Sequence, residues 1–398
     1  MVQTRSMAAG KAPKPGKIQK KSKRRPQKGN STAQESLKDW LAQYPKQDWE
    51  LLQTIRGWNM TFEPSQEDLI KRFEGKLFAP QIAPSEDFWS ETRKEVIVKM
   101  VCDEAERLCK RKASPDIGLY INSEQVQEDE QIRVLAAKLI KDFKADKSSG
   151  TKQIRFLRLD SINKTRRYPE FIKEAKIIER NRVSILIQSP GSKSDLHTDV
   201  GQGGALSTGV KLWAFFPPTE KNMELMRQYY SLESQQGIKG VAKKEFWDTH
   251  ALEHGVWLVQ NAGELLYTPS EAPHAVFTFS WSILITAHVD TAVTFVRNLK
   301  HQRTELAFTG SENEDNIKRL YLCLHEITPE KVGKRLFLQL RDDVTQNWPG
   351  IEEVVKDRAT RQEWREIVSA LQKMFQGVME EELPDCMALN RSRKRKRV

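Results

Sequence analysis

The residues with the clearest chemical potential lie in one stretch, SDLHTDVGQGG, from Ser194 to Gly204. It holds a histidine and an aspartate two positions apart, His197 and Asp199, between an apolar run and a glycine cluster. Residues two apart in an extended chain project to the same face, so this imidazole and carboxylate could bind one metal ion. The same pattern also fits an ordinary strand end that runs into a turn.

The spacing alone is weak support for a metal site, because the chain has seven histidines and contains a second such pair, His288 and Asp290. We interpret that second pair as a strand end. His250 and His254 have the spacing of metal ligands on a helix, but no third ligand lies nearby, so we expect them at the surface. His274 is different, because it begins a strand after a proline-bounded turn and can serve as a third ligand beside the first pair.

Two imidazoles and one carboxylate on one face of an iron ion leave three positions open, as in the facial triad of non-haem Fe(II) oxygenases. Such an iron needs a co-reductant, commonly 2-oxoglutarate, whose distal carboxylate requires a cation. Lys211 begins the strand-like run KLWAFFPP and is placed to supply that cation. Ser194 lies three residues before His197 and can add a hydrogen bond. The competing interpretation is a cofactor-free fold in which both histidines are core residues.

The elements that must position these residues follow from the composition along the chain. We predict a disordered basic tail (1–35), a helical lobe (36–150), a β-rich domain (151–300) with a helical insertion at about 220–250, a C-terminal helical region (301–385) and a second basic tail (386–398). Every motif framed by glycines lies in the β-rich part. The predicted fold class is therefore α+β, with helices on both sides of a central β core.

Three motifs of this core resemble the catalytic centre of the JmjC-domain oxygenases, and the resemblance runs from Ile185 to about Asp290. The motifs are ILIQSPGSKSDLHTD, GVKLWAFFPPTEKN and GELLYTPSEAPHAV, in the order the family has them. Within that family, the chain most resembles the branch of histone lysine demethylases linked to F-box and plant-homeodomain (PHD) modules. The resemblance implies a double-stranded β-helix, which is a jelly roll of two antiparallel sheets.

The resemblance also implies a role for each residue of the site. By it, His197, Asp199 and His274 are the catalytic iron ligands, Lys211 binds 2-oxoglutarate, and Ser194 takes the place of an assisting threonine. The implied protein is an Fe(II)- and 2-oxoglutarate-dependent dioxygenase that acts on a protein substrate, with histone lysine demethylation as one candidate reaction. A side-chain hydroxylase and a non-catalytic, chromatin-associated scaffold are the alternatives.

The sequence departs from the family on the substrate and oxygen side. The segment GQGGALSTG, before Lys211, is shorter than the strand pair usual in the family. Glu271, Ala272 and Pro273 stand where the family has Gly-Trp, and the following strand ends in AHVD instead of Gly-Asn-Phe. The sequence therefore supports iron and cofactor binding better than it supports histone demethylation.

The net charge of +11 is concentrated at the two ends of the chain. Residues 1–28 carry ten Lys or Arg and residues 391–398 carry six, which leaves the body at about −5. These clusters favour nuclear import and weak nucleic-acid contact, while solvated disordered tails are the plainer interpretation. We expect a nuclear protein with a protein partner such as a histone tail and no membrane segment. The four cysteines form no CxxC pair and are expected as reduced thiols.

Overall fold

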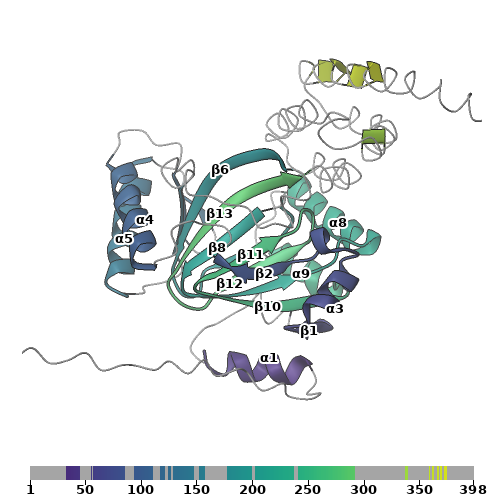
Figure 1. Cartoon of the computed structure of the whole chain (residues 1–398), viewed down its shortest axis with the longest axis horizontal. Helices are drawn as coiled ribbons and strands as arrows, with labels where there is room; N and C mark the ends of the chain where they lie inside the picture. The colour runs from purple at the N-terminus through teal and green to yellow at the C-terminus, as the bar shows by residue number, and fades with distance from the viewer. Residues whose placement is uncertain are drawn as a thin grey trace, which may run out of the picture.

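The computed structural model describes residues 33–44, 55, 57–85, 94–110, 117–121, 124–126, 129–147, 152–156, 177–199, 202–236 and 241–291, and isolated positions between 337 and 373. Residues 1–32 of the predicted N-terminal tail, the whole predicted C-terminal tail and nearly all of the predicted C-terminal helical region lie outside these residues, whereas residues 33–35, predicted as disordered, begin a helix. The centre of the described part consists of two β-sheets with helices on their outer faces (Figure 1).

The smaller sheet has five strands and carries the predicted site. Its strand order is β1 (Met60–Phe62), β10 (Gly255–Asn261), β9 (Val210–Phe215), β12 (His274–Thr278) and β7 (Lys193–His197). All neighbours are antiparallel except β1, which runs parallel to β10. Because side chains alternate along a strand, Lys211, Trp213 and Phe215 of β9 share the face opposite that of Leu212 and Ala214.

The larger sheet has eight strands, in the order β2 (Gln81–Pro84), β11 (Glu264–Thr268), β8 (Gln202–Thr208), β13 (Ser282–Thr291), β6 (Ile177–Gln188), β5 (Lys152–Phe156), β3 (Ile117–Ile121) and β4 (Glu124–Gln125). Apolar side chains from the inner faces of the two sheets pack together, among them Trp213 and Phe215 against Leu206 and Leu284. This sandwich confirms the predicted α+β class with a jelly-roll core.

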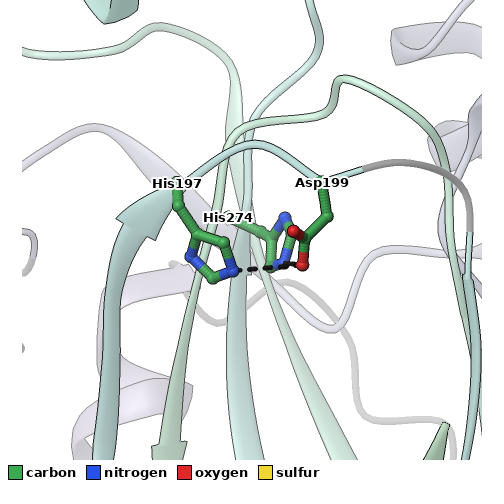
Figure 2. A group of neighbouring side chains, drawn as sticks. All are labelled: His197, Asp199 and His274. Carbon is green, nitrogen blue, oxygen red and sulfur yellow. Dashed lines mark ion pairs between the residues drawn. The ribbon is translucent and has the colours of Figure 1, made fainter. Parts of the chain in front are cut away.

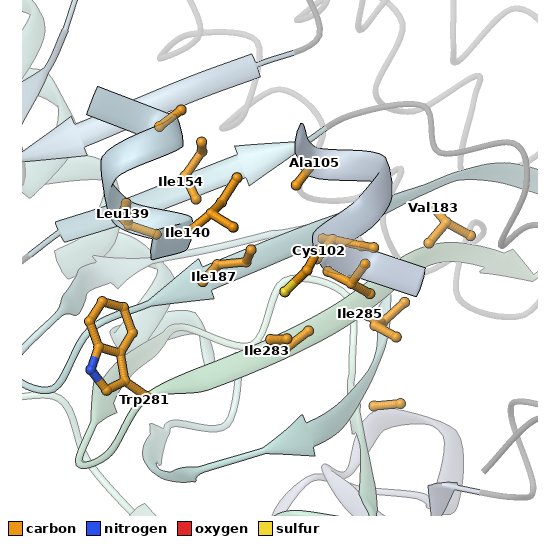
Figure 3. Packing of buried hydrophobic residues seen from close by; sticks show 14 of the residues in the cluster. Cys102, Ala105, Leu139, Ile140, Ile154, Val183, Ile187, Trp281, Ile283 and Ile285 are labelled. Carbon is orange, nitrogen blue, oxygen red and sulfur yellow. The ribbon is translucent and has the colours of Figure 1, made fainter. Parts of the chain in front are cut away.

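Helices cover the outer face of each sheet. Helices α4 (Lys94–Cys109) and α5 (Asp129–Lys144) pack on the larger sheet, where Ile187, Ile283 and Ile285 meet Cys102 and Leu139 (Figure 3). Helices α1 (Ala33–Leu41), α8 (Glu220–Gln236) and α9 (Val241–Thr249) pack on the smaller sheet through a second apolar cluster. Helices α8 and α9 connect β9 to β10, within the expected insertion at about 220–250.

The structure places strands in two segments where the sequence did not predict them. The segment 36–150, expected as a helical lobe, also supplies β1 to β4, in addition to α3 (Gln66–Arg72). The glycine-rich segment before Lys211 was not predicted as a strand, but it forms β8 between β11 and β13. Strands as short as MTF or QIAP show no measurable alternation, and their pairing with β10 and β11 is set by contacts far along the chain. In β8, a Cβ at Gly204 would lie 3.2 Å from Leu284 Cδ1, so the glycine allows close packing.

Two smaller expectations can be compared with the described residues. No helix among them combines the length and the apolar character needed to cross a membrane. Cys102 of α4 is a buried free thiol, and burial raises its pKa. The side chains of the other three cysteines lie outside the described part of the chain.

Candidate metal centre

The two predicted histidines face each other from neighbouring strands. His197 is the last residue of β7 and His274 is the first of β12; the two are paired in register, and their ring centroids lie 4.3 Å apart. Asp199 lies just beyond the end of β7. Its Oδ2 is 3.3 Å from Nε2 of His197 and 3.8 Å from Nε2 of His274 (Figure 2). The predicted triad is therefore assembled around one point.

Each imidazole is oriented by its other ring nitrogen. Nδ1 of His197 lies 2.6 Å from the carbonyl oxygen of Asp195, and Nδ1 of His274 lies 2.9 Å from that of Ala272. We assign the proton to Nδ1 in both rings, because a carbonyl can only accept a hydrogen bond. The Nε2 lone pairs then point toward Asp199. Such a backbone contact fixes the tautomer and the ring orientation of a metal-binding histidine.

The electrostatics of the triad favour a cation at this point. Burial, and then the charge of His197, lower the pKa of His274 to about 4, so this ring is neutral at pH 7. Burial opposes protonation of His197, but the neighbouring Asp199 carboxylate outweighs it and raises the pKa of His197 above its usual value. The Asp199 carboxylate thus favours positive charge beside the His197 ring, and a bound metal ion would supply that charge.

The residues fit a metal ion in donor type and spacing. One nitrogen or oxygen atom of each residue lies within 4.8 Å of the others, and this is the one such group among the described residues. Ligands about 2.1 Å from an ion and at right angles would be about 3 Å apart, which these side chains reach with small movements. The side chains of His197 and Asp199 are 31% and 37% exposed, so the site is open on one side for further ligands. The set matches an Fe(II) facial triad.

Lys211 lies deep between the sheets and is fully buried. Its ammonium group donates hydrogen bonds to Oε1 of Gln188 on β6 and to Oγ1 of Thr278 on β12, the latter at 2.9 Å. Gln188 in turn donates from Nε2 to Oε1 of Gln153 at 2.8 Å, which fixes its amide oxygen toward the lysine. Burial lowers the pKa of Lys211 to about 7, and no carboxylate of the described residues pairs with it. A buried cation with two neutral acceptors is suited to receive an anion.

Ser194 is placed between the triad and the lysine. It pairs in register with Val276, which lies between His274 and Thr278 on β12. Alternation along β12 puts all three of those residues on the inner face, and Ser194 shares it. The described hydrogen bonds of Lys211 go to other residues, so any joint action of Ser194 with Lys211 requires a ligand between them.

Three contacts of the site were not anticipated from the sequence. Gln188 and Thr278 bind Lys211, and the hydroxyl of Tyr230 on α8 accepts a hydrogen bond from the backbone N–H of Thr198 at 2.9 Å. A signal existed for the first two, because each is a polar residue on the inward phase of an otherwise apolar strand. Nothing in the local sequence pointed to Tyr230.

The two other histidines whose side chains the structure describes do not join the triad. His250 is exposed, stacks on Phe246 with ring centroids 4.3 Å apart, and has its Nδ1 2.9 Å from the Phe246 carbonyl oxygen. His254 is also exposed, as expected. The backbones of His288 and Asp290 belong to β13, and their side chains lie outside the described residues.

Comparison with known families agrees with this geometry. Residues 184–289 match the family model described as JmjC domain, hydroxylase. The match supports a JmjC domain in the centre of this chain. A search of curated proteins gave no match. The JmjC segment contains the triad, Ser194 and Lys211, and a hydroxylase domain with this donor set is consistent with Fe(II) binding.

Proposed function

We propose that the chain is an Fe(II)- and 2-oxoglutarate-dependent dioxygenase that acts on a protein substrate. The observation that carries the proposal is the placement of a fully buried lysine, with only neutral partners among the described residues, on the same sheet face as the triad. A metal-binding scaffold has no need of that lysine. A metal site that chelates one end of a dicarboxylate does.

The spacing along the paired strands β9 and β12 fits this cosubstrate. His274 pairs with Phe215, and Thr278 pairs with Lys211, so metal and lysine rows are four residues apart. Four residues of a strand span about 13 Å, a gap that the lysine side chain and 2-oxoglutarate can share. Trp213 and Val276 pair with each other between these rows and form the apolar floor of the gap.

Each side chain then has a defined task. Lys211 and, through one more hydrogen bond, Ser194 hold the distal carboxylate. His197, His274 and Asp199 would hold Fe(II), which supplies the redox chemistry of oxygen activation when it is bound. Because His197 and Asp199 are about one-third exposed, the substrate approaches from their side. The balanced reaction converts 2-oxoglutarate, O2 and a substrate C–H bond into succinate, CO2 and a C–OH bond.

Demethylation is the finer form of the same proposal. If the hydroxylated carbon is an N-methyl group of lysine, the product loses formaldehyde, whereas hydroxylation of a side-chain carbon leaves a stable alcohol. Histone tails are the protein substrates to test first, since two basic clusters suggest nuclear residence. Trapping of formaldehyde during turnover on methylated histone peptides separates the two products.

Visible absorption under nitrogen tests the site without knowledge of the substrate. Purified protein mixed with Fe(II) and 2-oxoglutarate should develop a charge-transfer band as the keto acid chelates the iron. His197→Ala should abolish the band, because it removes one of three ligands. His250→Ala is the matched control, since that histidine is exposed and outside the triad, and its band should equal that of the wild type. Absence of a band from the wild-type protein would refute the oxygenase and leave the scaffold alternative.

A further inference from the structure

The carboxylate ligand of the triad is held from outside its own strand. The ladder between β7 and β12 ends at the pair His197 and His274, so Asp199 lies beyond it. Two backbone hydrogen bonds hold the chain at this point. The N–H of Thr198 donates to the hydroxyl of Tyr230 at 2.9 Å, and the N–H of Glu271 donates to the carbonyl oxygen of Asp199 at 2.9 Å. One contact comes from α8 and the other from the turn before β12.

Helix α8 packs tightly on the smaller sheet, so the position of Tyr230 on this helix is well defined. Met223, Met226 and Tyr229 are buried on its inner face. At its first turn, Nδ2 of Asn222 donates to the carbonyl oxygens of Pro217 and Glu253 at 2.8 and 3.0 Å. Oδ1 of Asn222 accepts the N–H of Glu253 at 2.9 Å. The helix is thereby tied to the segment that precedes it and to the segment between α9 and β10.

We propose that Tyr230 is a positioning residue for the metal centre, acting through the backbone of Thr198; this inference rests on the metal site of the proposed function. The amide that Tyr230 binds lies between the two ligands of the His-x-Asp pair. Its orientation sets the backbone torsions that carry the Asp199 carboxylate toward the histidines. A phenol has few rotatable bonds, so it fixes this amide at low entropic cost.

The position of Tyr230 also gives the inserted helices a function. They connect β9, which carries Lys211, to β10. Through the hydroxyl group of Tyr230 they also contact the turn that carries the metal ligands. Outer contacts of this kind typically change metal affinity about 10–100-fold when they are removed. Because Tyr230 binds backbone and not a ligand side chain, we expect an effect of about tenfold, at the lower end of that range.

Titration with Co(II) in the absence of cosubstrate tests the inference, since its d–d absorption reports binding directly. Tyr230→Phe should weaken Co(II) binding about tenfold, because it removes only the accepting hydroxyl. Tyr229→Phe is the matched control. It removes a hydroxyl from the neighbouring residue of the same helix, which packs against Trp247 at a centroid distance of 4.9 Å. This control should bind Co(II) within about twofold of the wild type.

Thermal unfolding separates positioning from general loosening of the helix. The metal-free melting temperatures of the two variants should be alike, whereas the rise on adding Co(II) should be smaller for Tyr230→Phe. Equal Co(II) affinity of Tyr230→Phe and wild type, or equal losses in both variants, would overturn the inference and leave the proposed function standing. Failure of the wild type to bind Co(II) would instead remove the metal site itself and the inference with it.

Discussion

The metal triad and the lysine cluster share strand β12 but are built in opposite ways. The triad lies at a strand end, carries a carboxylate and is about one-third exposed at two of its three members. Lys211 lies where β9 pairs with β12, is fully buried and has neutral partners. One region is an open centre with negative charge that attracts a cation. The other is a closed centre with positive charge that attracts an anion.

This difference teaches how a single sheet face can hold a ligand with two distinct ends. The carboxylate of the triad requires a metal ion, and the lysine requires an anion. A dicarboxylate that binds this metal ion through one end supplies the anion for the lysine through its other end. The regions should therefore respond separately to substitution. Changes at the lysine should alter cosubstrate affinity and leave metal affinity as it is.

Lys211→Met should give the largest separation of the two regions. Loss of a charge-assisted hydrogen bond corresponds to about 1.5–3 kcal/mol, so affinity for 2-oxoglutarate should fall about 10–100-fold. Titration of the Fe(II)-loaded protein under nitrogen measures it, and Co(II) affinity should be unchanged. Lys193→Met is the matched control, because Lys193 is partly exposed and pairs in register with Phe277 of the outer face. Equal losses of both affinities would show that the two regions are not independent.

The two regions also differ in how far they could be predicted from sequence. The triad was predictable, because His197 and Asp199 are close in the chain and His274 follows a recognisable turn. Lys211 was predictable from its strand and its motif. Its partners were not, because Gln188 and Thr278 meet it only after the strands of two sheets have taken their register. Alternation gives the face of a residue but not its neighbour across the sandwich.

The same limit explains the errors in the fold. The β-rich core was predicted from β-branched and aromatic runs bounded by turn residues, and the jelly roll was implied by the resemblance to the JmjC family. Strand β1 is three residues long and pairs with β10, so its existence depends on the strand it joins. Strand β8 is rich in glycine and lacks the composition of a strand, yet it lies between β11 and β13. The contact of Tyr230 with Thr198 likewise joins an inserted helix to a distant turn.

Gln188→Glu should weaken 2-oxoglutarate binding by placing a carboxylate of the protein beside Lys211. The new carboxylate would lie where the amide oxygen now accepts a hydrogen bond from Lys211, so the protein would provide its own anion. Affinity for 2-oxoglutarate should then fall about tenfold, since the ligand must displace an internal ion pair. Gln188→Met keeps the size of the side chain without the charge and should have a smaller effect. If Glu and Met weaken binding equally, Gln188 acts only by packing.

The pH dependence of cosubstrate binding should report the charge of Lys211. Its pKa of about 7 means that the free protein carries about half a charge there at pH 7 and about a tenth at pH 8. Because the bound carboxylate requires the charged form, affinity should fall about fivefold between these pH values. The pKa of His274, about 4, lies outside this window. Binding to Lys211→Met should be flat across it.

The charge of Lys211, which favours cosubstrate binding, should destabilise the ligand-free protein. The pKa of Lys211 is lowered on folding, from the ordinary 10.5 to about 7, so the unfolded chain holds its proton more firmly. The destabilisation from burying the charge is therefore fully present below pH 7 and declines as pH rises from 7 toward 10.5. Lys211→Met should be stabilising relative to the wild type below pH 7, and this gain should shrink at higher pH. Urea unfolding at several pH values measures both.

Ser194→Ala should have the smallest effect on 2-oxoglutarate affinity. It tests whether the distal carboxylate reaches the row between the metal ligands and Lys211. Ser194 lies in the row between the metal ligands and Lys211, and one neutral hydrogen bond contributes about 0.5–1.5 kcal/mol. Affinity for 2-oxoglutarate should fall about threefold with metal affinity unchanged. Ser192→Ala is the matched control, because the Ser192 hydroxyl already bonds that of Ser189 at 3.3 Å. A larger loss for Ser192→Ala would place the distal carboxylate nearer the row of Thr278, deeper in the sandwich than Ser194.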